Sequence, residues 1–511
     1  MALLASALVI SLVPASVAAS RDDARLDAQF AQAAKSGALL RLLLQQFPKG
    51  ADLHRHSEGA IYAEDFIDWA ADKEGCFVVE TQSLAPGPCN EPASLPLNGL
   101  GARDIARYNQ AVDAMSMGRH DEDAGEDAVS GHERFFRTFR RFDFGSRGER
   151  ARIIATNRAE AARENIHYLE LMAGVDMRRD LRAAFGTEPW NEADMAGRFE
   201  RLQAFVKDAI PAARAAVDET QRKVDELGSC GTDKPTPACE VTLRYLMTIG
   251  REAVPEQVFG RLVLAFAMVD ADPRYVGVNI AQPEDGPVSM RDYSLHMRMF
   301  AFLKQRFPDV PLTLHAGELS LGLVPPQGLT FHIREAVEIA GASRIGHGVD
   351  ITYESDAPQL LARMARERIA VEINLTSNDV ILGVKGNEHP LRLYLAAGVP
   401  VALSSDDPGV SRVDLTRDYE RAVTEHGLTY TELRQVSRNS LTYSFLEGES
   451  LWGSEGKLVT ACASGLSRKA AACEGFLSGS AKAREQWRLE QALARFEAEL
   501  PGLVARYAPA R

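Results

Sequence analysis

Apolar and polar residues along this chain alternate between two patterns, the two-residue period of a strand and the 3.6-residue period of a helix. Eight short apolar runs have the pattern of strands, and most of them are separated by stretches with the spacing of amphipathic helices. Strands that alternate with helices form parallel sheets, so eight such units predict an α/β protein built on a closed (β/α)8 TIM barrel. The eight runs are residues 51–56, 167–173, 241–249, 275–282, 311–318, 344–349, 369–377 and 399–407.

The barrel is predicted to occupy residues 48–446, with helical segments on both sides. Residues 20–47 have the pattern of an N-terminal helix, ended by Pro48 and Gly50. Residues 447–511 are predicted to form a C-terminal helical extension.

Two insertions are predicted within the barrel. The first, at about residues 74–131, is polar and rich in Gly, Pro and Asp; the second lies at about residues 179–240. In the second, residues 191–227 form one amphipathic helix or two, with a break expected at Pro211. The apolar stripes on these helices are typical of packing faces.

Six cysteines fall into three close pairs, Cys76/Cys89, Cys230/Cys239 and Cys462/Cys473. Six cysteines allow fifteen connectivities, so spacing alone does not settle their pairing. In an exported protein we expect local disulfides that staple surface insertions. A zinc knuckle is the alternative, and the absence of histidines near the pairs disfavours it.

The first residues determine the expected compartment. Residues 1–19 are apolar, end in small residues and carry no charge before Arg21, which favours a secretory signal cleaved near Ala18 or Ala19. The protein is then exported, to the periplasm or outside the cell. Because no basic residue precedes the apolar run, an uncleaved N-terminal anchor or a misassigned start stays open.

Composition excludes some classes of partner. The chain has 511 residues, of which 45% are hydrophobic and 25% charged, so it can bury a large core. Its formal net charge of −13 argues against binding to nucleic acids or anionic membranes through bulk charge. The expected partner is a small molecule, and a homodimer is compatible with the sequence, which does not fix the oligomeric state.

Candidate chemistry begins with the run LTLHAGE at residues 312–318. A strand pattern ends there in His315, which can offer an imidazole nitrogen to a metal, and the small Ala316-Gly317 pair lets Glu318 approach the same ligand. A buried, hydrogen-bonded histidine at a strand end is the more frequent case. The metal hypothesis depends on other strands ending in compatible ligands.

Such residues do end the other predicted strands. His54 and His56 are two apart in a strand and point to the same side, a good pair of zinc ligands, although a surface strand with two incidental histidines has the same pattern. Polar residues at the remaining ends are Glu170, Gln282, Glu284, His347, Asn374, Asn378, Asp406 and Asp407. In a TIM barrel all of these ends meet at the catalytic face.

Taken together, the motifs resemble the adenosine deaminase family of the metallo-dependent hydrolase superfamily. The pieces occur in the family's order: PKGADLHRHSEGA (48–60), HYLELM (167–172), LTLHAGE (312–318), RIGHGVD (344–350), EINLTSN (372–378), HPLRLYLAAGVPV (389–401) and LSSDDP (403–408). The predicted signal, the cysteine-bearing insertion and the SSDDP motif resemble those of the secreted adenosine deaminase-related growth factor branch.

The resemblance implies a role for each matching residue. One Zn²⁺ per chain would be bound by His54, His56, His315 and Asp406. Glu318 would protonate purine N1, His347 would orient the activated water and help to take its proton, and Asp407 would hold N7. Three imidazoles and a carboxylate suit zinc, which lowers the pKa of bound water to about 7.

Two positions depart from the family's usual pattern. Glu58 stands where an Asp associated with the sugar 5′-hydroxyl is usual, and Gln282 stands where a glycine commonly offers its N–H to the purine. The Gln282 side chain is therefore expected to narrow or re-line the substrate pocket. Both are counted as substrate-binding candidates, and they leave the preferred aminopurine open.

The resemblance implies hydrolytic, zinc-dependent deamination of adenosine or 2′-deoxyadenosine to inosine or deoxyinosine and ammonia. One alternative is a deaminase of a modified adenosine or another aminopurine. A different class of protein, an extracellular adenosine-binding or signalling protein with vestigial catalysis, is disfavoured by the full set of catalytic residue types.

Overall fold

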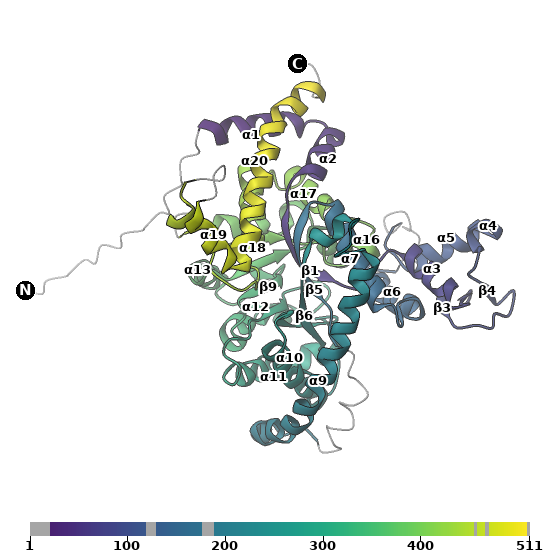
Figure 1. Ribbon diagram of the computed structural model, residues 1–511. Helices are drawn as coiled ribbons and strands as arrows, with labels where there is room; N and C mark the ends of the chain where they lie inside the picture. The colour runs from purple at the N-terminus through teal and green to yellow at the C-terminus, as the bar shows by residue number, and fades with distance from the viewer. Residues whose placement is uncertain (1–20, 119–128, 176–188, 454–456, 465–469, 508–511) are drawn as a thin grey trace, which may run out of the picture.

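Parallel strands form the centre of the molecule in this computed structural model, with helices around them (Figure 1). The structure describes residues 21–118, 129–175, 189–453, 457–464 and 470–507. Two four-stranded parallel sheets have the orders β1-β5-β6-β7 and β11-β10-β9-β8. Parallel bridges between Val278 and Leu312 and between Arg55 and Asp406 join the two sheets and close the barrel. The strands are β1 (Gly50–His56), β5 (Ile166–Met172), β6 (Thr242–Gly250), β7 (Tyr275–Ala281), β8 (Thr313–Ala316), β9 (Arg344–His347), β10 (Ala370–Ile373) and β11 (Val401–Leu403).

The predicted (β/α)8 barrel is confirmed, and each predicted run overlaps one barrel strand. Strands such as β8, β9 and β10 are buried along their whole length, because side chains fill the barrel on one face and helices cover the other. Several strands end earlier than predicted. His347 and Asp406, at or just beyond two of these ends, have φ values of +71° and +59°, which turn the chain out of the sheet.

Helices surround the barrel and cover its N-terminal end. Those that follow or flank the strands are α7 (Arg150–Arg163), α9 (Met195–Leu227), α10 (Pro255–Ala271), α11 (Pro287–Lys304), α12 (His332–Glu335), α13 (Ala357–Glu367), α14 (Leu375–Leu382), α15 (Leu391–Ala396), α16 (Pro408–Ser411), α17 (Leu415–Thr424) and α18 (Tyr430–Thr442). The terminal helices are α1 (Arg21–Ala33), α2 (Gly37–Gln46), α19 (Ala471–Ser478) and α20 (Ala481–Tyr507). In Figure 1 the long helix α20 crosses α1 above the barrel.

The N-terminal segment is two helices, where the sequence pattern predicts one. The break lies at Ser36, which has extended backbone angles and whose Oγ accepts a hydrogen bond from Leu39 N at 3.3 Å. A serine in this position caps a new helix, and that local bond outweighs the continuous apolar spacing.

Helix α9 is the reverse case, since it continues through Pro211 where a break is expected. Pro211 is exposed, and the neighbouring buried positions are Val206 and Ala213. A proline inside a helix removes one backbone hydrogen bond and crowds the carbonyl four residues earlier, but on the solvent side of a long helix it displaces no core packing.

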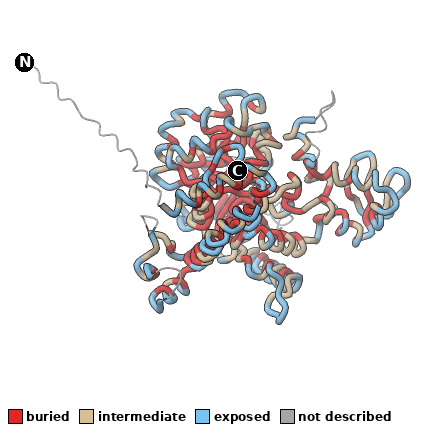
Figure 2. The backbone as a smooth tube through the Cα atoms, turned by 90° about the horizontal axis from the view of Figure 1, so that it is seen from above, coloured by how far each residue is buried: buried red, intermediate tan, exposed pale blue. Residues whose placement is uncertain are grey.

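An arm projects from the barrel after β1, and we define it as residues 63–118 and 131–146. It contains α3 (Ala63–Asp72), α4 (Leu100–Arg103), α5 (Ile105–Ala114), α6 (Gly131–Ser146) and an antiparallel sheet of β2 (Cys76–Val78), β3 (Ser83–Ala85) and β4 (Ser94–Pro96). Figure 2 shows buried residues inside this arm as well as in the central body. The arm has an apolar cluster distinct from the main core, and that cluster also includes Ile153, Ile381 and Val410 of α7, α14 and α16. Most of the insertion predicted at 74–131 lies in it.

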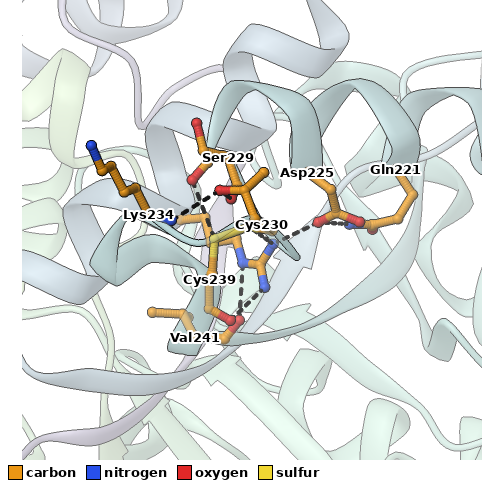
Figure 3. Close-up of a disulfide and its surroundings, with 10 residues drawn as sticks. Gln221, Asp225, Ser229, Cys230, Lys234, Cys239 and Val241 are labelled. Atoms are coloured by element: carbon orange, nitrogen blue, oxygen red, sulfur yellow. Dashed lines mark hydrogen bonds and ion pairs between the residues drawn. A yellow bond between two sulfur atoms is a disulfide. The ribbon is translucent and has the colours of Figure 1, made fainter.

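All six cysteines form the three local disulfides expected, Cys76–Cys89, Cys230–Cys239 and Cys462–Cys473. The second bridge closes the turn between α9 and β6 (Figure 3). Beside it Arg158 donates to the carbonyls of Cys239 and Val241 and to Asp225, each at 3.0 Å. The pairing rules out the zinc-knuckle alternative.

The predicted export signal at residues 1–19 lies outside the described residues. Among the helices that the structure describes, none has both the length and the apolar character needed to cross a bilayer.

The disulfides lead to a prediction about stability. Each closes a short loop, with sequence separations of 13, 9 and 11 residues. Loss of a native disulfide costs about 2–4 kcal/mol, and all three lie outside the barrel strands. Reduction should therefore loosen the arm and the segments closed by Cys230–Cys239 and Cys462–Cys473 before the barrel unfolds.

Alkylation followed by mass spectrometry should find no reactive thiol in native protein; six alkylated cysteines without reductant would contradict the pairing. The double variant Cys230→Ser/Cys239→Ser should reproduce the local loosening without reductant.

Candidate active site

Three histidines and an aspartate meet at the C-terminal end of the barrel. His54 and His56 end β1, His315 lies in β8 and Asp406 follows β11; their ligand atoms lie within 4.8 Å of one another. His54 Nε2 and His56 Nε2 are 3.4 and 3.3 Å from Asp406 Oδ1. His56 Nε2 is 3.2 Å from His315 Nε2. The structure thus brings the four sequence-predicted ligands together.

Hydrogen bonds on the outer side orient two of these imidazoles. His54 Nδ1 lies 2.7 Å from Glu372 Oε2, and His315 Nδ1 lies 3.1 Å from Asn279 Oδ1. An oxygen acceptor at Nδ1 keeps the proton there and leaves the Nε2 lone pair directed into the centre, the arrangement typical of metal-binding histidines. Sequence reasoning assigned no role to Glu372 or Asn279. The signal was present, because each is a polar residue between buried apolar neighbours of a strand and so needs a partner.

This donor set fits a zinc ion. Ligands at about 2.0–2.1 Å around a tetrahedral zinc stand about 3.3 Å apart, which matches the separations of 3.2–3.4 Å measured here. His54 Nε2 is buried and has no hydrogen-bond partner, a cost that a bound cation would remove. Burial lowers the pKa of His315 well below its usual value, so this imidazole is neutral and able to bind a metal.

Glu318 and His347 stand beside this centre. Glu318 Oε1 lies 3.7 Å from His347 Nδ1, and His347 Nε2 lies 3.9 Å from Asp406 Oδ2. Burial, followed by the charges of Asp406 and Glu284, raises the pKa of Glu318 well above its usual value. A carboxyl held in its protonated form can act as a proton donor.

A second carboxylate holds the loop that carries Glu318. Glu284 accepts hydrogen bonds from Gly317 N at 3.0 Å and Glu318 N at 2.9 Å, and its Oε1 lies 2.6 Å from His332 Nδ1. Gly317 has a φ of +77°, and a Cβ there would lie 2.4 Å from Asp350 Oδ1. The HAGE turn therefore needs its glycine for both backbone conformation and space.

Asp407 points into a space that Gly59 leaves open. A Cβ on Gly59 would lie 1.5 Å from Asp407 Oδ1, so the carboxyl occupies the place of a side chain. Asp407 takes the N-cap position of α16, but its side chain makes no capping bond and Oδ1 is buried without a partner. Burial and the charge of Asp406 raise the pKa of Asp407. A helix-capping role, the structural alternative for this residue, is therefore not what its side chain does.

The two substrate-binding candidates lie at the rim. Glu58 is exposed in the turn after β1. Gln282 follows β7 with a φ of +83°, and its Oε1 accepts a hydrogen bond from Glu252 N at 3.0 Å while lying over Gly250. This bond ties the Gln282 side chain to the loop after β6. The expectation that this side chain re-lines the substrate pocket stays a prediction.

The arm reaches the same face of the barrel. Met117 N donates to Val410 O at 2.8 Å, just after Asp407, and His132 Nε2 lies 2.9 Å from Asp285 Oδ1 in the loop after β7. The arm therefore contacts two of the loops that border the site.

Comparison with known proteins covers the second half of the chain most clearly. The family model described as adenosine deaminase matches residues 208–451. The adenosine deaminase of Shewanella loihica is 36% identical over 146 residues, which are 28% of this chain and 41% of that protein. That of Aliivibrio fischeri is 32% identical over 200 residues, 39% of this chain and 53% of that protein. The chain thus spans about half the length of the curated relatives it matches.

Solved structures agree on the fold over most of the chain. The crystal structure of Arabidopsis ADAL complexed with IMP has a TM-score of 0.50 at 19% identity and covers 90% of this chain and 98% of that one. The structure of an ADAL–IMP complex has a TM-score of 0.52 at 18% identity and covers 90% and 99%. At this identity the likeness concerns the fold alone.

The matched sequence begins after β1 and β5, yet the structure places His54 and His56 against the matched residues His315 and Asp406. Fold, motif order and sequence similarity agree, and residues 208–451 of this chain match the adenosine deaminase family.

Proposed function

We propose that this protein is a zinc-dependent aminohydrolase that converts adenosine or 2′-deoxyadenosine and water into inosine or deoxyinosine and ammonia. The observation that carries the proposal is the convergence of a four-residue metal-ligand set with two buried carboxyl groups, Glu318, whose pKa burial raises, and Asp407, whose Oδ1 has no hydrogen-bond partner. Sequence similarity to adenosine deaminases supports the same chemistry.

The metal would be held by His54, His56, His315 and Asp406. Bound there, zinc would supply an activated water, since it lowers the pKa of water from 15.7 to about 7. Glu372 and Asn279 keep the Nε2 atoms of His54 and His315 directed toward it.

The remaining residues act on the substrate. Glu318 gives a proton to ring nitrogen N1, which makes C6 electrophilic. Asp407 donates a hydrogen bond to N7, because N7 carries no proton, and His347 orients the attacking water. The C6–O bond forms and the C6–N6 bond breaks. Of the two protons of the attacking water, one restores the proton that Glu318 gave to N1 and the other goes to the leaving nitrogen, so ammonia leaves and the product is the 6-oxo nucleoside.

A modified adenosine or another aminopurine is the second candidate substrate. Two residues at the border of the site, Gln282 and Glu58, depart from the family's usual pattern and support it. Gln282 keeps its backbone N–H, while its side chain is held by Glu252 N. Glu58 places a longer acid where the family usually has Asp.

We also propose that the protein is exported. Six cysteines in three disulfides are typical of an oxidising compartment, and the apolar residues 1–19 have the pattern of a signal. N-terminal sequencing of native protein should then begin near Ala19 or Ser20; a chain that retains residues 1–19 would contradict the proposal.

A substrate panel tests the proposed reaction. Purified protein with its zinc content measured should release ammonia from adenosine or deoxyadenosine and form the 6-oxo product. N6-methyladenosine, AMP, adenine, guanosine and cytidine complete the panel. Fast turnover of only a modified or phosphorylated aminopurine would favour the second candidate, and no turnover of any aminopurine by zinc-loaded protein would reject the reaction.

Asp406 and Asp407 should fail in different ways. Asp406→Ala removes a metal ligand, so zinc content and activity should fall together. Asp407→Ala removes a substrate contact and leaves all four ligands, so zinc should stay near one per chain. Its kcat/KM should nevertheless fall about 100- to 1,000-fold, the scale for one hydrogen-bond donor that acts in the transition state. Metal analysis beside kinetics separates the two; full zinc in Asp406→Ala would contradict the ligand assignment.

Gln282→Gly tests the rim. Glycine accepts the positive φ without strain but loses the bond to Glu252 N, two effects of about 1 kcal/mol each that oppose one another. The free energy of unfolding should therefore change little. The ratio of kcat/KM between one purine nucleoside and another should change by a factor that corresponds to about 1–3 kcal/mol at most. Gln282→Ala is the matched control, because it loses the same bond and keeps the strained backbone. An equal loss of activity on every substrate would show a role in the chemistry itself.

A further inference from the structure

A chain of hydrogen bonds runs from the backbone at the start of α15 to the side chain of His347. Leu391 N donates to His389 Nδ1 at 3.2 Å, and His389 Nε2 lies 3.0 Å from Asn378 Oδ1. Asn378 Nδ2 then lies 3.0 Å from His347 Nδ1. All three side chains are buried, with exposed fractions of 3% or less.

The direction of this chain is fixed at one end. A backbone N–H can only donate, so His389 Nδ1 must accept and its proton must be on Nε2. Burial lowers the pKa of His389 to about 3, which leaves a neutral ring with a single N–H. That N–H donates to Asn378 Oδ1, and the amide of Asn378 can then present only its NH₂ group to His347 Nδ1.

A second amide faces the same nitrogen. Asn374 Nδ2 lies 3.4 Å from His347 Nδ1, and Asn374 Oδ1 has no partner. Glu318 Oε1 is 3.7 Å away, beyond hydrogen-bond length. The nearest neighbour of His347 Nδ1 is therefore the NH₂ group of Asn378, whose direction the chain of bonds fixes, and in the neutral ring Nδ1 must accept from it and carry no proton.

We propose that His389 and Asn378 are positioning residues that fix the single proton of neutral His347 on Nε2. The Nε2 atom is buried, has no hydrogen-bond partner and lies 3.9 Å from Asp406 Oδ2, so it faces the reaction centre. Two residues outside that centre thus decide which nitrogen of His347 offers a donor to it.

The role in catalysis rests on the proposed function. With the proton on Nε2, His347 donates a hydrogen bond to the attacking water oxygen and holds it in place. It does not begin the reaction as the base at that atom. This narrows the role expected from the sequence, in which His347 orients the water and also helps to take its proton.

The tautomer of His347 can be determined by NMR, independently of any enzymatic activity. Protein labelled with ¹⁵N-histidine, freed of metal by a chelator, should show His347 as the Nε2–H tautomer in a long-range ¹H–¹⁵N correlation spectrum, with the signal assigned by its loss in His347→Gln. Zinc addition should leave that pattern in place. A proton on Nδ1 in the wild-type protein would overturn the proposal, whatever any variant does.

Substitutions then test the two positioning residues. In Asn378→Asp the carboxylate can only accept, so His347 should move its proton to Nδ1. Zinc content should be kept, and kcat should fall about 10- to 100-fold with a smaller change in KM. His389→Gln retains an N–H for Asn378 and should keep the tautomer, whereas His389→Leu should not.

Asn439→Asp is the matched control. Asn439 is also buried, donates to Val401 O at 3.0 Å and accepts from Gln435 Nε2 at 2.9 Å, but it is not part of the His347 chain. It should leave the His347 spectrum unchanged. If Asn378→Asp keeps both the Nε2–H tautomer and full kcat, the positioning role is wrong. If the tautomers behave as expected but no aminopurine is deaminated, the proposed function fails and the hydrogen-bond chain stands.

Discussion

Charged groups inside a barrel that excludes water must be met by opposite charge or by hydrogen bonds, because an unpaired buried ion costs several kcal/mol. Glu372 shows how this protein meets that constraint. Its carboxylate bonds to His54 Nδ1 at 2.7 Å, to Thr313 Oγ1 at 2.7 Å and to Arg344 Nε at 2.5 Å. Arg344 also reaches Glu170 at 2.5 Å. Glu372, which orients the candidate metal ligand His54, is thus held in place by buried Arg344, and Arg344 is in turn paired with buried Glu170.

The groups left without partners are as informative as the paired ones. In the part of the chain that the structure describes, His54 Nε2, His347 Nε2 and Asp407 Oδ1 are buried and lack hydrogen bonds, and all three lie at the same end of the barrel. A fold that satisfies Glu372 so completely leaves these atoms for something that is not protein. They mark where the cation, the water and the purine of the proposed function would complete the polar groups of the barrel.

Sequence reasoning reached the barrel, the three disulfides and the set of residues that converge, because periodicity, cysteine spacing and strand ends are local patterns. It erred where a local bond or solvent exposure outweighed the pattern, as at Ser36 and Pro211. The sequence marks Glu372 and Asn279 as polar residues in buried strands, but it names neither their partners nor the direction of the Gln282 side chain. Those depend on which residue of another strand or loop lies opposite, and no spacing along the chain encodes that.

The closure of the barrel has a consequence for the order in which the protein folds. Asp406 N donates to His54 O and His56 N donates to Asp406 O, both at 2.9 Å, so the strands that join the ends of the barrel also carry its ligands. Asp52 and Ser405, which bond beside this junction, are 353 residues apart. Contacts this distant in sequence form late, after most of the chain entropy has been lost. On the proposed function, a nascent chain has no metal centre until its eighth barrel strand is made, and a bound metal would then stabilise a barrel that is already complete.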